Sequence, residues 1–144
     1  MTEFGFEVED LHSADLSRDG RRLAFTDGSK VFIRNLDDRR PRAVFEKPNI
    51  QDLFWSPDGQ ELAIDVDEQL WRVNVDTGES ELICDLPDLP RVPRAFILAG
   101  AWRPDGTRVT ALVFTRSPVD RSTTVREWES ESAEPGESWS AIWR

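Results

Sequence analysis

The sequence predicts an all-β fold made of three four-stranded antiparallel units. Two repeated features predict it. A short apolar phrase ending in Asp-Gly occurs three times, and its Asp-Gly pairs start at residues 19, 58 and 105, so the spacings are 39 and 47 residues. Alternating apolar and polar residues follow each phrase, which indicates half-buried strands. No ten-residue stretch shows the periodicity of an amphipathic helix.

The repeated phrase predicts a tight turn. An Asp side chain can hydrogen-bond its own backbone in a turn, and Gly adopts positive φ without a Cβ clash. Pro57 and Pro104 preset φ at the first corner of two of the phrases. Asp-Gly between two apolar runs favours a hairpin. The predicted turn residues are Asp19, Gly20, Asp58, Gly59, Asp105 and Gly106.

Strands are predicted after each turn. Alternation is clearest over residues 70–76, and a second phrase, Gly-Glu-Ser, occurs at both 78–80 and 136–138 before the last run of a unit. Two phrases repeated in one order are a stronger signal than one. The chain is therefore predicted to be a single domain over residues 1–144, with units at about 11–49, 50–88 and 96–144.

The spacing of the phrases is typical of a β-propeller blade, whose period is roughly 40–45 residues. The phrase resembles the TolB-type, WD-like β-propeller repeat, and Trp55-Ser56-Pro57-Asp58-Gly59 matches that signature best. The third copy has Arg103 in place of Ser, and the first has Leu16 in place of Trp and Arg18 in place of Pro. The resemblance implies a fold and no single function, because such blades occur in periplasmic translocation proteins, prolyl oligopeptidase-class peptidases and interaction modules.

Three blades are too few for an ordinary propeller, which has four to eight. Each terminal blade would leave an apolar face uncovered. We therefore expect a homodimer in which two chains close one six-bladed ring about a two-fold axis. Residues 3–8 alternate, and residues 1–10 are expected to add a latch strand through Phe4 and Phe6. The alternative is a fragment, or a half-propeller completed by another protein.

The six tryptophans divide into two groups. Trp55 and Trp102 occupy the same position of the repeat, which predicts packing between blades. Trp128, Trp139 and Trp143 occur only in the last unit, and tryptophan is enriched at interfaces. Together with Phe4 and Phe6 they are predicted to form the closing interface, with interior packing as the alternative.

Composition excludes several classes of function. The chain has 28 acidic and 18 basic residues, a net charge of −10, one His and one Cys. So acidic a chain repels phosphate backbones, so no nucleic-acid partner is expected. One His and one Cys cannot supply the usual zinc ligands. No apolar run is long enough to span a membrane, and the acidic start is unlike a secretory signal. A cytoplasmic location is expected, or a periplasmic one if an upstream signal was removed.

Few residues are candidates for chemistry. His12 is the only histidine and no Gly-x-Ser-x-Gly elbow is present, so a structural role for His12 and no catalytic residue are predicted. Residues 65–68, Asp-Val-Asp-Glu, resemble half a calcium loop but lack its spacing and central Gly, which favours a polar hairpin tip. Asp15 is expected to line the channel, and Cys84 to be a small hydrophobe on an outer strand.

Arginines gather in two clusters, at 18–22 and 39–42, interleaved with acids. They are interpreted as solubilising the turns. No phosphate-binding glycine loop is present, so no cofactor and no metal site are predicted.

Three functions are compatible with the sequence. The favoured one is a non-catalytic scaffold that binds another protein, favouring a basic one, through its loops. The second is an enzyme or a binder of a small molecule or ion at the channel. The third is an acidic inhibitor or immunity-type protein directed at a basic target.

Overall fold

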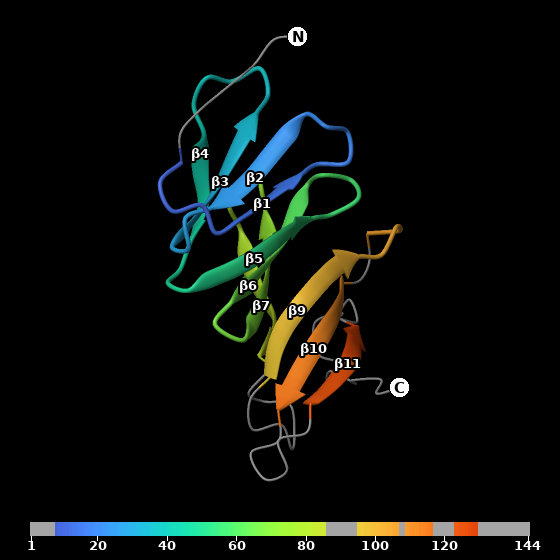
Figure 1. Cartoon of the computed structure of the whole chain (residues 1–144). Helices are drawn as coiled ribbons and strands as arrows, with labels where there is room; N and C mark the ends of the chain where they lie inside the picture. The colour runs from blue at the N-terminus through green and yellow to red at the C-terminus, as the bar shows by residue number, and fades with distance from the viewer. Residues whose placement is uncertain (1–7, 86–94, 107–108, 117–122, 130–144) are drawn as a thin grey trace.

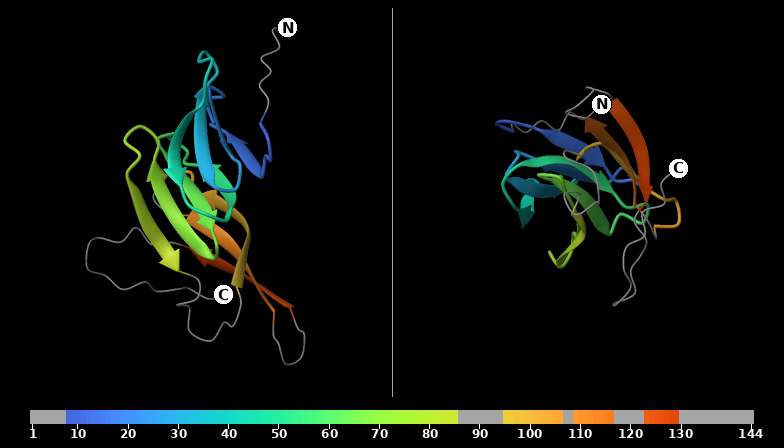
Figure 2. Two further views of the ribbon diagram at one scale, coloured as in Figure 1. Left: turned by 90° about the vertical axis from the view of Figure 1, so that its left-hand side faces the viewer. Right: turned by 90° about the horizontal axis from the view of Figure 1, so that it is seen from below.

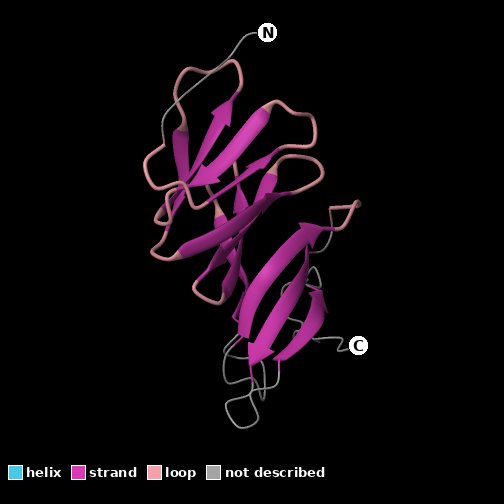
Figure 3. Cartoon of the chain, viewed as in Figure 1, coloured by secondary structure: helices cyan, strands magenta, loops and turns pink. Residues whose placement is uncertain are grey.

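The computed structural model describes residues 8–85, 95–106, 109–116 and 123–129 of the 144-residue chain. These residues form eleven strands and no helix (Figure 1), as the secondary-structure view also shows (Figure 3). The predicted all-β fold is therefore confirmed. The described part of the chain contains no helix that could span a membrane.

The strands form three antiparallel sheets, and in each sheet the strands are ordered as in the chain. The first sheet contains β1 (Ser13–Leu16), β2 (Arg22–Thr26), β3 (Lys30–Asn35) and β4 (Arg42–Glu46). The second contains β5 (Ile50–Trp55), β6 (Glu61–Val66), β7 (Gln69–Asn74) and β8 (Ser80–Asp85). The third contains β9 (Ala95–Trp102), β10 (Val109–Arg116) and β11 (Thr123–Glu129).

Two of the three predicted four-stranded units are seen in full, as the first and second sheets. The fourth strand predicted for the last unit falls on residues 130–144, outside the described residues. Phe4, Phe6, Trp139 and Trp143 also lie outside them, and Trp128 is on β11 with its side chain not described.

The sheets follow one another in chain order down the molecule in Figure 1, and Figure 2 shows that order from two other sides. The first strands of the sheets contact one another, β1 with β5 and β5 with β9. Each first strand runs directly into a repeated turn. The three turns are therefore gathered at one end of the first strands.

The largest core cluster lies between the first and second sheets, because a single sheet has no interior of its own. Alternate residues of β2 and β3, Ala24, Val31 and Ile33, point toward the second sheet and are at most 3% exposed. Leu62 and Ile64 of β6 meet them from the other side. The period-two pattern of the sequence thus selects one face of each strand for this contact.

The first two repeated turns are held by the same hydrogen bonds. Ser17 Oγ donates to Asp19 Oδ1 at 2.7 Å and accepts from Arg22 N at 2.9 Å. In the second turn the hydroxyl of Ser56 makes the same two bonds, to Asp58 Oδ1 at 2.6 Å and from the backbone N–H of residue 61 at 2.9 Å. The two turns, which share one sequence pattern, therefore have the same two side-chain hydrogen bonds.

These bonds favour the charged form of both aspartates. A backbone N–H bond from Arg21, then the Ser17 hydroxyl, lowers the pKa of Asp19 below its usual value. The Ser56 hydroxyl, then the backbone N–H of Gln60, lowers the pKa of Asp58.

Glycine is required at the end of each turn. Gly20, Gly59 and Gly106 have φ of 70°, 69° and 74°, a region that other residues rarely adopt. Gly106 N donates to the carbonyl oxygen of Arg103 at 2.9 Å, as Gly59 N does to that of Ser56. The third turn thus keeps the backbone bond although Arg replaces the serine.

We predict that Ser56→Ala destabilises the protein by about 1–3 kcal/mol, because the partly buried N–H of residue 61 loses its acceptor. Ser56 is only 2% exposed, so water cannot easily replace the hydroxyl. Chemical denaturation measures the difference. Gln60→Ala, on the exposed side of the same turn, is the control, and equal free energies of unfolding for the two variants would contradict the prediction.

Candidate functional site

A cleft of about 470 Å³ opens where the three repeated turns meet. Matching positions of the three repeats line the cleft, so the cleft is a consequence of the sequence repeat. The lining residues are Asp15, Leu16 and Arg18 from the first repeat, Phe54, Trp55, Ser56 and Pro57 from the second, and Ala101, Trp102 and Pro104 from the third.

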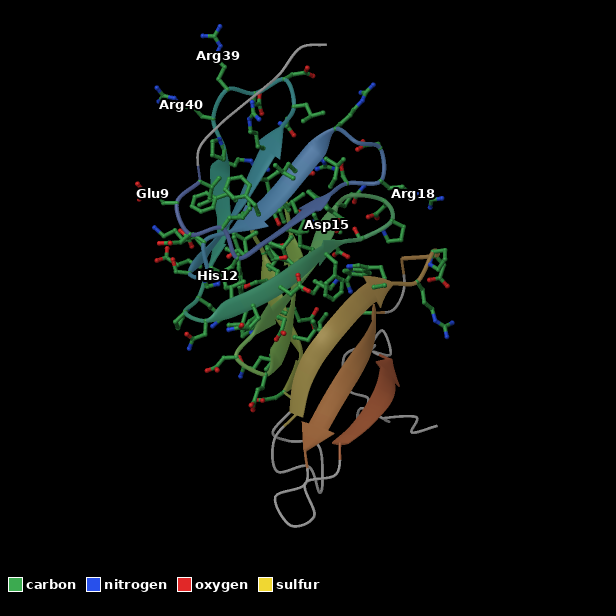
Figure 4. All side chains as sticks on the ribbon, viewed as in Figure 1. Glu9, His12, Asp15, Arg18, Arg39 and Arg40 are labelled. Atoms are coloured by element: carbon green, nitrogen blue, oxygen red, sulfur yellow. The ribbon has the colours of Figure 1, made fainter. Side chains whose placement is uncertain are left out.

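The Asp15 carboxylate in this cleft is hydrogen-bonded to the backbone of the protein itself. Asp15 Oδ2 accepts from Trp55 N at 2.9 Å, and its Oδ1 accepts from Leu16 N at 2.9 Å. Figure 4 shows Asp15 between β1 and β5. The carboxylate predicted to line a channel therefore joins the first and second sheets.

The Ser56 hydroxyl in the cleft is also hydrogen-bonded within the protein. Ser56 Oγ is engaged by Asp58 and by the backbone N–H of residue 61. What remains exposed in the cleft is mainly apolar, because Pro104 is exposed and Pro57 and Trp102 are half-buried. Arg18 adds a positive charge at the edge and points away from the sheets (Figure 4).

Two tryptophans of the repeat connect neighbouring sheets. Trp55 Nε1 donates to the carbonyl oxygen of Asp15 at 3.0 Å, and Trp102 Nε1 donates to that of Phe54 at 3.2 Å. A guanidinium lies over each indole ring, Arg22 at 5.1 Å from the Trp55 ring centroid and Arg72 at 5.9 Å from that of Trp102. Such cation–π contacts add to the indole bonds.

The expectation that the arginine clusters solubilise turns is incomplete for two of their members. Arg22 donates from Nη2 to the carbonyl oxygen of Gly59, in the second sheet. Arg42 donates to the Val75 carbonyl oxygen at 2.7 Å. Both also lie 3.8 Å from an oxygen of Asp76. Sequence alone did not reveal this, because the acceptors are backbone atoms of a neighbouring repeat.

The other members of the clusters behave as expected. Arg18, Arg39 and Arg40 are exposed and point outward in Figure 4.

Charge is divided unequally between the first two sheets. Residues 13–46 contain eight Lys or Arg and six Asp or Glu, whereas residues 50–85 contain one Arg and ten Asp or Glu. The arginines that cross the interface therefore run from a basic sheet to an acidic one. The second sheet is the main source of negative potential in the described chain.

Asp65 is a buried acid that the sequence did not predict. It was placed at a polar hairpin tip, but it lies on β6 and is only 4% exposed. Asp67 and Glu68 alone form the tip, with φ of 50° and 69°. Residues 62–66 also form a strand-like run in the sequence, and the first two residues of Asp-Val-Asp-Glu continue that strand, so the polar tip is shorter than predicted.

The surroundings of Asp65 oppose its negative charge. Asp52 is its direct partner across the β5–β6 ladder. Burial, then the charge of Asp52, raises the pKa of Asp65 to about 7. Among the described residues, Asp65 Oδ1 has no hydrogen-bond partner. Asp52 Oδ1 is occupied by the Ser13 hydroxyl at 2.6 Å.

His12 and Cys84 are the remaining candidate residues from the sequence. The His12 ring packs against the β2–β3 turn, where a Cβ on Gly28 would lie 2.7 Å from His12 Cε1. Cys84 is on β8, and its side chain is outside the description. In the described ranges no three His, Cys, Asp or Glu side chains are grouped to hold a metal ion.

Comparisons with known proteins identify the fold. No protein-family model and no curated protein matches the sequence. The β-propeller domain of the trilobed protease from Pyrococcus furiosus matches 88% of this chain with a TM-score of 0.60 and 17% identity. A chain of a mitotic checkpoint complex matches 85% with a TM-score of 0.56 and 19% identity. The fold is that of a β-propeller.

Hydrazine synthase from Kuenenia stuttgartiensis matches 83% of the chain with a TM-score of 0.61 and 14% identity. This chain spans 42%, 37% and 38% of the protease, checkpoint and hydrazine synthase chains respectively. At these identities the likeness shows the fold alone.

We predict that Asp65→Asn changes how stability depends on pH. The pKa of Asp65 is about 7 in the folded protein and near 3.8 for a free carboxyl. Its neutral form is therefore favoured by folding, and the stability it contributes is full below pH 4 and is lost as pH rises to about 7. Across that window the wild type loses up to about 1.4 kcal/mol per pH unit relative to the asparagine variant.

Thermal and chemical denaturation between pH 4 and pH 8 tests this. Asp65→Asn is expected to be the more stable protein above pH 7. Glu79→Gln removes an exposed carboxylate that does not act on Asp65, so it is the matched control and keeps the wild-type profile. An Asp65→Asn profile parallel to that of the wild type would refute the assignment.

Proposed function

We propose that this chain is a non-catalytic β-propeller scaffold that binds another protein at the cleft. The observation that carries the proposal is the state of the polar groups in the cleft. The Asp15 carboxylate and the Ser56 hydroxyl are both bonded to the backbone and side chains of the fold, so the cleft offers an apolar surface rather than a reactive group. Apolar surface rimmed by loops is suited to holding a protein segment.

Two structural neighbours come from protein complexes, which supports an interaction role. One is the mitotic checkpoint complex, and another is the nidogen/laminin complex, matched over 88% of this chain with a TM-score of 0.56 and 7% identity. Propellers of this kind serve several functions, so the likeness supports the proposal through the fold only.

The proposed partner is basic. The second sheet, which supplies Phe54, Trp55 and Pro57 to the cleft, has ten acidic residues against one arginine. Complementary charge raises association rates and excludes acidic competitors. An apolar side chain of the partner would occupy the cleft while its basic residues face the second sheet.

A small-molecule binder is the second candidate. The cleft volume of about 470 Å³ lies in the range of ligand pockets, roughly 300–1,000 Å³.

We also propose that two copies close the ring. The chain covers about two fifths of the protease propeller, checkpoint and hydrazine synthase chains that it matches. Two copies would supply six blades, within the usual four to eight.

Pro57→Lys tests binding at the cleft. The substitution places a positive charge in the lining, and a type I turn tolerates lysine at that corner. We expect capture of a protein from the native host to fall about tenfold or more, a loss of about 1.4 kcal/mol. Gln60→Lys adds the same charge on the same turn outside the cleft, and it should leave capture within about twofold.

Each outcome of that comparison is decisive. Equal loss in the two variants means that charge alone governs binding and refutes the cleft as the site. No loss in either refutes it as well. Retained protein capture together with a small molecule displaced by Pro57→Lys supports the second candidate instead.

Light scattering tests the ring. A mass near twice 16.5 kDa is expected at micromolar concentration. A monodisperse particle of 16.5 kDa would reject closure by a second copy.

A further inference from the structure

The contact between one sheet and the next, which we call the joint, contains the same hydrogen bond in both described cases. Trp55 of the second sheet donates its indole N–H to the carbonyl oxygen of Asp15, and Trp102 of the third sheet donates to that of Phe54. Asp15 directly precedes Leu16, and Phe54 directly precedes Trp55. The acceptor is thus always the residue before the tryptophan position of the preceding repeat.

The first and third sheets carry the two halves of this joint. The acceptor position of the third sheet is Ala101, which directly precedes Trp102 and is exposed. The donor position of the first sheet is Leu16, which has no N–H in its side chain. Leu16 is 51% exposed, whereas Trp55, its counterpart in the second sheet, is 7% exposed.

Strand register shows which way Leu16 faces. Leu16 pairs with Leu23, and Phe25 pairs with Phe32. Along β2 and β3 these residues alternate with Ala24, Val31 and Ile33, whose side chains belong to the core and face the second sheet. Leu16, Leu23 and Phe32 therefore lie on the opposite face of the first sheet, where a preceding blade would pack.

We infer that, in the ring proposed above, Leu16 of one copy packs against the third sheet of a second copy at Ala101, and that this closing interface is the weakest joint of the ring. We assign this contact to a second copy, because the third sheet of that copy carries the same acceptor position. The first and second sheets use that position to bind the sheet that follows each of them. The contact is head-to-tail and occurs twice, which a two-fold axis along the channel closes.

The chemistry at the closing interface differs from that at the two internal joints. An internal joint combines apolar packing with an indole hydrogen bond and a guanidinium over the ring. The closing interface has the packing alone, because leucine supplies neither a donor nor an aromatic ring. The ring is therefore expected to open there first, by dissociation into two half-rings.

Leu16→Trp tests the inference by adding the missing donor. It completes the joint at both closing interfaces, so the dimer dissociation constant should fall by about tenfold or more. Leu16→Arg places a charge in the same contact and should raise it by about a hundredfold. Sedimentation velocity over a wide concentration range measures both, and circular dichroism confirms that each variant is folded.

Leu82→Trp is the matched control. Leu82 is 38% exposed and lies on β8, the outer strand of the second sheet, away from the first strands. Its dissociation constant should stay within about twofold of the wild type.

The outcomes separate this inference from the proposal on which it rests. If the wild type and every variant stay monomeric at all concentrations, ring closure itself is refuted. If the wild type is a dimer and the Leu16 variants behave like Leu82→Trp, the dimer uses another face and only the closing interface is refuted. Weaker association of Leu16→Trp would contradict the donor rule.

Discussion

The structure depends on the contact between one sheet and the next. A four-stranded sheet is a single layer, and it can bury apolar side chains only against a neighbour. The joint makes that contact specific, because an indole N–H reaches a backbone carbonyl at one fixed position of the preceding repeat, at 3.0 Å for Trp55 and 3.2 Å for Trp102. Indole N–H groups and backbone carbonyls are both costly to bury unpaired, so the pairing fixes the offset between sheets as well as stabilising them.

The same joint explains why the cleft has little chemistry of its own. The first strands must approach closely for the indoles to reach, which brings the three repeated turns together. The polar groups at that point, Asp15 and Ser56, are then used to hold the backbone. A surface built this way is suited to recognition, and the unequal charge of the first two sheets gives it a preference in partner.

The repeat allowed much of the fold to be predicted. Asp-Gly identified the turns because glycine adopts the required positive φ without a Cβ clash, and alternation identified the strands because side chains of a strand point to opposite faces. The prediction also placed Trp55 and Trp102 between sheets, from their shared position. It failed at Asp65, whose burial was not predicted, because three of the four residues in Asp-Val-Asp-Glu are acidic. Burial of an acid leaves no local signal, since it depends on what covers that face.

The sequence by itself therefore determined the strands, the turns and the existence of a repeat, because these follow from local backbone preference and period. Tertiary structure alone decided the partners of the polar groups. Arg22 looked like a solvated turn residue, yet it bonds to the Gly59 carbonyl of the next repeat. Register and sheet packing bring together residues about forty positions apart. Every residue has a backbone carbonyl, so the sequence does not show which donor will bond to which carbonyl oxygen.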